Sequence, residues 1–227
     1  MLDVSRKELK YMIGTEEVYF YKERLEKIMD ADPHNRDGGY TIRSLYFDTI
    51  SDKDYYEKLD GVDNRRKVRI RIYDGNTDVI KLELKAKDSD FQRKRSLSLS
   101  KDEADMMIDG DYSFLLERPE PFAQAMFTYM STGGYVPKCI VEYDRLAFMN
   151  EANDIRLTFD MRLRALEDPQ EFFSARSDTY QVADPSETTL EVKYNGFLFT
   201  YIKDTLDIVN RPRISNSKYV RARAFLK

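Results

Sequence analysis

Charged side chains recur at every second position between residues 65 and 87, a spacing that could bind phosphate. The first half of this stretch alternates Arg69 and Arg71 with aliphatic residues, and the second half alternates Lys81, Glu83 and Lys85 with them. Side chains of a β-strand point to opposite faces in turn, so each half has one apolar and one charged face. The Asp-Gly-Asn sequence at residues 74–76 favours a chain reversal. The sequence therefore predicts a hairpin with a charged face.

The hairpin alone leaves two interpretations of this face open. In the first, an antiparallel sheet exposes its charged face to water. In the second, the charged faces of several strands point into a closed barrel and bind a polyanion. Such a ligand would offset the repulsion between basic side chains that lie opposite one another.

The overall charge limits the partners of the chain. Its 37 basic and 41 acidic residues give a formal net charge of −4. A general nucleic-acid or membrane-surface protein would be basic overall. We therefore expect no nucleic-acid partner, while a basic interior inside an acidic exterior remains compatible with the totals.

Single copies of two residue types exclude several kinds of chemistry. Cys139 is the only cysteine, so no internal disulfide can form and a reducing compartment is expected. His34 is the only histidine, which rules out zinc sites of the usual His/Cys type and leaves no partner for Ser/His/Asp catalysis. No apolar run approaches the roughly 18 residues that span a bilayer. These observations predict a soluble, cytoplasmic protein.

The elements that would position the charged residues are mostly strands. Alternation and turn residues predict about eight of them, mostly antiparallel, together with flanking helices. We expect one domain over residues 1–227, with a helical insertion at about 101–135. Expected strands are 6–13, 40–48, two within 65–87, 91–100, 138–148, 155–163 and 188–194. Expected helices are 15–29 with Thr15 as its cap, 52–59, one that starts at a capping box at residues 100–103, 119–130 and 200–209.

Six of the expected strands have a charged residue on a single face. These are Glu8 and Lys10; Arg69 and Arg71; Glu83, Lys85 and Lys87; Lys94; Arg156; and Glu191 and Lys193. Lysine and arginine match phosphate oxygens, and carboxylates with phosphate oxygens suit Mg²⁺ or Mn²⁺. Basic rows with a few glutamates thus favour a water-filled barrel that holds phosphates and a divalent metal.

Short motifs along nearly the whole chain resemble one known family. They are ELKYMI, SLYFDT, YYEKLDG, KVRIRIY, KLELKAK, VEYDRLAF, RLTFD, LEVKYNG and SKYV. Together they resemble the VTC domain, the polyphosphate polymerase domain of the vacuolar transporter chaperone complex, a triphosphate tunnel metalloenzyme. The resemblance implies an α+β fold dominated by β, namely an eight-stranded antiparallel tunnel-like β-barrel with flanking helices.

The resemblance also implies an activity and its residues. The eukaryotic domain transfers the terminal phosphate of ATP to a growing polyphosphate chain, with Mn²⁺ or Mg²⁺ as cofactor. ATP and polyphosphate are thus the expected ligands, and an unidentified membrane partner is a further option. The implied catalytic residues are Lys10, Arg69, Arg71, Lys85 and Glu191. Further phosphate-binding residues are Lys94, Arg145, Arg156, Lys193 and Lys218, and the carboxylates for metal are Glu191, Glu8, Glu83 and Glu142.

Two departures from the pattern affect these assignments. Related tunnel triphosphatases open with Glu-x-Glu-x-Lys, whereas this chain has Arg6 at the first position, which disfavours a second metal and a hydrolase. Simple alternation also puts Arg145 on the face opposite Glu142. Either a bulge turns Arg145 inward, or Glu142 is the inward residue.

Three functions therefore follow from the sequence. The first is a nucleotide-dependent polyphosphate polymerase. The second is a hydrolase of the same fold that acts on inorganic triphosphate or nucleoside triphosphates. The third is a module that binds polyphosphate without turnover.

Overall fold

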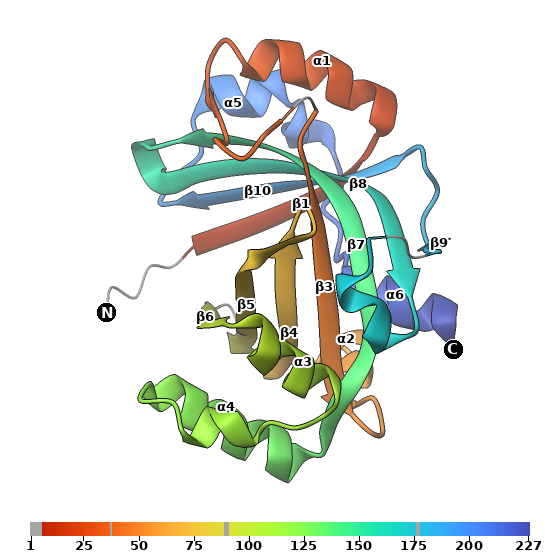
Figure 1. The fold of residues 1–227 in the computed structure, drawn as a ribbon. Helices are drawn as coiled ribbons and strands as arrows, with labels where there is room; N and C mark the ends of the chain where they lie inside the picture. The colour runs from red at the N-terminus through yellow and green to blue at the C-terminus, as the bar shows by residue number, and fades with distance from the viewer. Residues whose placement is uncertain (1–5, 37, 89–90, 176–177) are drawn as a thin grey trace. The chain divides into compact units, whose positions relative to one another are not determined.

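The computed structural model describes residues 6–36, 38–88, 91–175 and 178–227. Antiparallel strands dominate it, and helices flank them (Figure 1). The strands are β1 Arg6–Gly14, β2 Asp30–Ala31, β3 Tyr40–Thr49, β4 Arg65–Tyr73, β5 Asn76–Asp88, β6 Phe91–Leu99, β7 Tyr135–Asn150, β8 Ile155–Leu166, β9 Tyr180–Gln181 and β10 Glu187–Asn195. The α-helices are α1 Thr15–Leu25, α2 Lys53–Leu59, α3 Lys101–Ile108, α4 Pro121–Gly133, α5 Thr200–Thr205 and α6 Lys218–Leu226. Short 3-10 helices are η1 Ser113–Leu116, η2 Ala152–Asp154, η3 Pro169–Phe173 and η4 Ile208–Asn210.

The main strands are hydrogen-bonded in the order β1-β10-β8-β7-β3-β4-β5-β6. In addition, β2 pairs with β7 and β9 with β8. The prediction of a β-dominated α+β fold with an antiparallel sheet and flanking helices is confirmed. Among the described residues the path of paired strands is open, with β1 and β6 at its ends.

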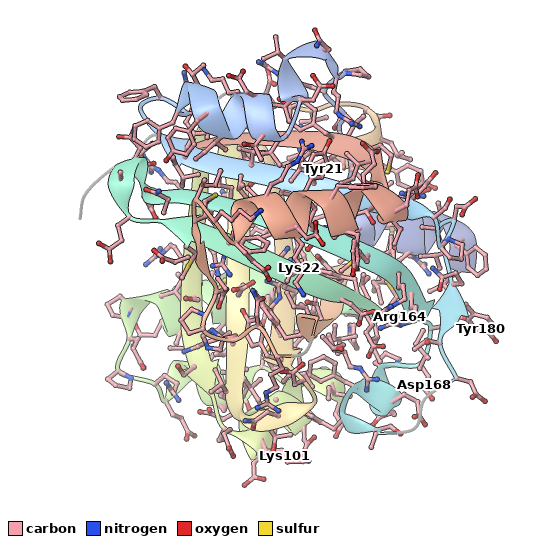
Figure 2. All side chains as sticks on the ribbon, turned by 90° about the horizontal axis from the view of Figure 1, so that it is seen from above. Tyr21, Lys22, Lys101, Arg164, Asp168 and Tyr180 are labelled. Atoms are coloured by element: carbon pink, nitrogen blue, oxygen red, sulfur yellow. The ribbon has the colours of Figure 1, made fainter. Side chains whose placement is uncertain are left out.

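The chain divides into two compact units, and β3, β7 and β8 contribute to both. The first unit comprises Met1–Thr41, Tyr143–Leu163 and Ala183–Ser217. In it, the apolar faces of β1, β8 and β10 pack with α1 and α5 into one core. Tyr21 of α1, labelled in Figure 2, stacks on Phe159 of β8 with ring centroids 6.2 Å apart. Alternation places the polar residues of these strands on the opposite face.

The second unit comprises Ile42–Glu142, Arg164–Val182 and Lys218–Lys227. Its core joins the apolar faces of β3, β4, β5 and β6 to α3 and α4, which lie against one side of these strands (Figure 1). Each large aliphatic side chain buried there contributes about 1.5–3 kcal/mol. The predicted helical insertion at about 101–135 therefore has a clear role, because its helices cover the apolar face of the hairpin and β6.

Local signals explain several helix ends. Ser100 accepts a hydrogen bond from the Glu103 N–H at 3.1 Å, and the Glu103 carboxylate accepts one from the Ser100 N–H at 2.8 Å, so the predicted capping box at α3 is confirmed. At α1 the cap is Gly14 rather than Thr15, because the carboxylate of Glu17 accepts the Gly14 N–H at 2.8 Å. None of the helices in the described part of the chain is long and apolar enough to cross a membrane.

Candidate active site

The polar face of the first unit is built by strand register. β10 lies between β1 and β8, and both pairings are antiparallel. Residues that are directly opposite on neighbouring strands have Cβ atoms about 5 Å apart. The register therefore aligns two polar rows, each with one residue from β1, β10 and β8: Lys10–Glu191–Thr158 and Glu8–Lys193–Arg156.

Lys10 is the centre of this group. Its Nζ lies 3.0 Å from Glu191 Oε1 and 3.2 Å from Glu8 Oε1, and it donates to the carbonyl oxygen of Asn216 at 3.2 Å. Burial would lower the pKa of Lys10, but the charges of Glu191 and Glu8 outweigh burial and raise that pKa above its ordinary value. The second oxygen of Glu191 accepts a hydrogen bond from Lys193 at 2.6 Å. Glu191 is thus held by two lysines.

Arg145 lies in a buried ion pair beside these rows. Its Nε donates to Asp160 Oδ1 at 2.6 Å and its Nη2 to Asp160 Oδ2 at 2.8 Å. Burial would lower the pKa of Arg145, and the Asp160 charge reverses that effect and raises it. Asp160 belongs to the face of β8 that also holds Arg156 and Thr158, since Leu157 and Phe159 face the core. Arg145 therefore points to the polar face.

Arg156 is anchored by a loop carboxylate. Its Nη2 donates to Asp32 Oδ2 at 2.6 Å and to the Tyr40 hydroxyl at 3.1 Å. Burial would raise the pKa of Asp32, but hydrogen bonds from His34 and the Arg156 charge lower it. The single histidine thus takes part in holding Asp32.

The second unit has its own cationic group around Glu83, which is 1% exposed. Arg69 Nη2 lies 2.7 Å from Glu83 Oε2, and Arg71 Nη1 lies 3.9 Å from the same oxygen. Lys94 pairs with the other oxygen of Glu83. Burial would raise the pKa of Glu83, but these three cations lower it to about 2. One carboxylate therefore gathers three basic side chains that would otherwise repel each other.

Neutral side chains and register orient these arginines. Arg69 Nη1 donates to the Tyr46 hydroxyl at 2.8 Å, and Arg71 Nε donates to the Ser44 hydroxyl at 3.1 Å. Both partners lie on β3, directly opposite the arginines of β4. On the next strand, β5, Lys85 is directly opposite Lys67 of β4 on one side and Lys94 of β6 on the other. The predicted residues Arg69, Arg71, Lys85 and Lys94 thus share one region of β4, β5 and β6.

Glu142 has arginines on both of its oxygens. Arg43 Nε donates to Oε2 at 2.7 Å, and Arg164 Nε, on the residue labelled in Figure 2, donates to Oε1 at 3.0 Å. Arg43 also donates to backbone carbonyls at the end of η3, including that of Ser174 at 2.6 Å. Ile140 faces the core of the second unit, and residues two positions apart on a strand share a face. Glu142 therefore lies on the same side of β7 as Ile140, the side that faces this core. Alternation in the sequence placed Arg145 and Glu142 on opposite faces of this strand. In the structure, Arg145 is the residue on the polar face.

The remaining predicted residue, Lys218, is the half-buried first residue of α6. Sequence reasoning did not single out Asp32, Asp160, Arg43 or Arg164 as partners of the predicted residues. The alternation of the strand at 155–163 did place Asp160 with Arg156. Nothing in a single sequence links Asp32, 124 positions away, to Arg156.

A divalent metal fits the first unit only with ligands from outside the protein. Among the described residues, no group of three His, Cys, Asp or Glu side chains could hold an ion. Glu8 and Glu191, however, both approach the Lys10 ammonium within 3.2 Å, so both carboxylates can reach one cation. Mg²⁺ is usually held by one or two carboxylates together with substrate phosphates. Glu191 and Glu8 satisfy that requirement.

Comparison with solved structures shows which proteins share this fold. The fold is shared with a putative adenylate cyclase from Bacillus halodurans, at 14% identity and a TM-score of 0.53 over 94% of this chain and 95% of that one. A putative adenylate cyclase from Vibrio parahaemolyticus is similar at 10% identity and a TM-score of 0.51, over 95% and 96% of the two chains. Among curated proteins no match was found.

These likenesses define the class of fold, a mainly antiparallel sheet with flanking helices. The family model of the VTC domain matches residues 5–227. The chain therefore belongs to the VTC domain family, and the resemblance noted in the sequence is confirmed.

Proposed function

We propose that the protein is a metal-dependent phosphotransferase that moves the terminal phosphate of ATP onto a growing polyphosphate chain. Membership of the VTC domain family supports a phosphate-related enzyme. The observation that favours transfer over hydrolysis is that the predicted metal carboxylates Glu8, Glu191, Glu83 and Glu142 all pair with basic side chains. For Glu83 this pairing lowers the pKa to about 2, which makes it a weak base.

The group around Glu83 supplies phosphate ligands in this proposal. Arg69, Arg71 and Lys94 present three positive charges to a single carboxylate. A phosphate chain would add the missing negative charge, and arginine forks match its oxygens. Lys85, in register with Lys94, extends this set. Glu83 keeps the cations together while no ligand is bound, so we assign it this organising role ahead of metal binding.

The group around Lys10 would hold the metal and further phosphate oxygens. Glu191, with Glu8, is the proposed metal ligand, and a bound Mn²⁺ or Mg²⁺ would spread the charge of the transferred phosphoryl group. Lys193 and Lys10 fix the orientation of Glu191 through both of its oxygens. Arg145 and Arg156 stay proposed phosphate ligands, with Asp160 and Asp32 holding them in place. Lys218 is proposed as a phosphate ligand on the sequence resemblance alone.

A phosphate acceptor removes the need for a strong base. The terminal oxygen of a polyphosphate chain is already anionic at neutral pH. It can attack the γ-phosphorus directly, the bond to the β,γ-bridging oxygen breaks, and ADP leaves with the electron pair. Catalysis then consists of positioning and charge stabilisation, which is the general pattern of phosphoryl transfer. Water as acceptor would require a base, and Glu83, with a pKa of about 2, is unsuited to that task.

The test is a product assay with a charge-neutral variant. Purified protein is incubated with ATP and Mn²⁺, and products are separated by gel for the wild type, Glu191→Gln and the exposed control Glu117→Gln. We expect polyphosphate and ADP from the wild type and the control, and a loss of at least about 100-fold in Glu191→Gln. Orthophosphate without chains would indicate the hydrolase, and tight polyphosphate binding without turnover would indicate a binding module. Either result would refute the polymerase.

A further inference from the structure

Two polar atoms on the face of β8 are buried without a hydrogen-bond partner. They are the hydroxyl oxygen of Thr158 and Nε of Arg156, and both belong to the few such atoms in the described part of the chain. Thr158 is 1% exposed. The two residues are separated by one position on a strand, so their side chains project from the same face. A buried polar atom without a partner costs stability, and such atoms are rare in folded proteins.

Acceptors near these atoms are engaged elsewhere. Glu191, directly opposite Thr158, binds Lys10 through one oxygen and Lys193 through the other. Asp160, the next residue on this face, binds Arg145 through both of its oxygens. Within the described part of the chain no protein atom is hydrogen-bonded to Thr158 Oγ1 or Arg156 Nε, so their partner is a water molecule or a ligand.

The chemistry of the two atoms defines that ligand. The Nε of arginine can only donate a hydrogen bond, so its partner must supply an acceptor atom. The ligand must offer acceptor oxygens. The neighbouring Lys10, Lys193 and Arg145 are cationic, which favours oxygens that carry negative charge. A phosphoryl group has several such oxygens and accepts from hydroxyl and guanidinium groups alike.

We propose that the Thr158 hydroxyl, together with Arg156 Nε, binds phosphoryl oxygens of the substrate beside Glu191. This assignment rests on the proposed function and adds to it a neutral donor that neither the charge pattern nor the family resemblance pointed to. A hydroxyl can stabilise a phosphoryl oxygen without adding another positive charge next to the metal ligand. It thereby places one phosphate of the chain next to Glu191.

Valine is the informative replacement, because it keeps the shape and the strand preference of threonine and removes only the hydroxyl. Thr188→Val is the matched control. Thr188 is a buried threonine of β10 whose hydroxyl lies 3.0 Å from that of Thr15. Two quantities are measured for each protein: the unfolding temperature without ligand, and the Kd of tripolyphosphate in the presence of Mn²⁺ by calorimetric titration.

We expect opposite behaviour of the two variants. Thr158→Val should unfold at the wild-type temperature or above it, and its Kd for tripolyphosphate should rise about tenfold, which is about 1.4 kcal/mol. Thr188→Val should unfold at a lower temperature, because it loses a hydrogen bond, and should bind as the wild type does. Arg156→Lys, which keeps the charge and loses Nε, should also bind more weakly.

Three results would overturn the proposal. If Thr158→Val unfolds at a clearly lower temperature, as the control should, its hydroxyl already has a partner in the free protein. If wild type and Thr158→Val bind tripolyphosphate equally, the hydroxyl is no ligand, and the proposed function stands without it. If the wild type does not bind tripolyphosphate with Mn²⁺, the proposed function fails together with this assignment.

Discussion

Lys10 of β1 and Glu191 of β10 are directly opposite each other in register, with Nζ 3.0 Å from Oε1. The ammonium also contacts Glu8 at 3.2 Å. A cation thus already lies between the two carboxylates proposed to bind the metal. Metal binding must compete with Lys10 unless an incoming phosphate draws the lysine to itself. This arrangement would couple the binding of metal to the binding of phosphate.

Neutralising Lys10 should separate these two events. In Lys10→Met the carboxylates lose their internal cation, so Mn²⁺ alone should bind about tenfold more tightly, as expected when a nearby like charge is removed. Tripolyphosphate should bind more weakly, because a phosphate ligand is lost. Titration with Mn²⁺ in the presence and absence of tripolyphosphate measures both effects. Lys7→Met, an exposed residue on the other face of β1, is the control. Equal Mn²⁺ affinity in the two variants would contradict the claim that Mn²⁺ and the Lys10 ammonium compete for the position between Glu8 and Glu191.

Glu83 should stabilise the fold through its three cations. In Glu83→Gln, Arg69, Arg71 and Lys94 lose their common counterion, and removing one partner of a buried ion pair costs about 3–5 kcal/mol. We expect a loss at the lower end of this range, because Lys94 is exposed. Urea unfolding at neutral pH measures it. The exposed Glu117→Gln variant should be unchanged.

The same contribution should disappear in acid. The pKa of Glu83 is lowered from an ordinary 4.5 to about 2, so the unfolded chain binds a proton before the folded protein does. The stabilisation is therefore complete above about pH 5 and is lost as the pH falls toward 2. Wild type and Glu83→Gln should converge in stability over this interval. A stability difference that stays constant down to about pH 3 would show that Glu83 acts by packing instead of charge.

The buried pair of Arg145 and Asp160 should be strongly coupled. Asp160→Asn leaves the Arg145 guanidinium buried without its carboxylate and should lower the free energy of unfolding by about 3 kcal/mol. In the double variant Arg145→Met/Asp160→Asn the uncompensated charge is gone, so much of this loss should be recovered. Urea unfolding of the wild type, both single variants and the double variant gives the coupling energy. Additive losses would contradict the pairing, because independent sites show no coupling.

Alternation in the sequence was enough to predict most strands and the faces of Arg69, Arg71, Glu83 and Glu191, since a strand has only two faces. Register was harder to predict. The hairpin puts Arg69 opposite Glu83, so the expected repulsion between facing basic residues is replaced at that point by an ion pair. Arg162, with a φ of 50°, interrupts the extended backbone of β8, and a period of two cannot anticipate such a residue.

Partners that are distant in the sequence could not be predicted at all. The contact of Asp32 with Arg156 and the position of Glu142 between Arg43 and Arg164 depend on tertiary packing. The unsatisfied hydroxyl of Thr158 is likewise visible only once its neighbours are in place. Residue type and spacing therefore indicated the basic side chains and the glutamates of their own rows. The aspartates that hold Arg156 and Arg145 came from the structure.

The central claim is that phosphate, and not water, accepts the phosphoryl group of ATP. The most direct measurement is a phosphorus NMR time course of the wild-type protein with ATP, using Mg²⁺ to avoid paramagnetic broadening and Glu191→Gln as the comparison. The account predicts a growing signal from phosphates inside a chain, matched by ADP formation and absent from the variant. Accumulation of orthophosphate with ADP and no internal chain signal would contradict it.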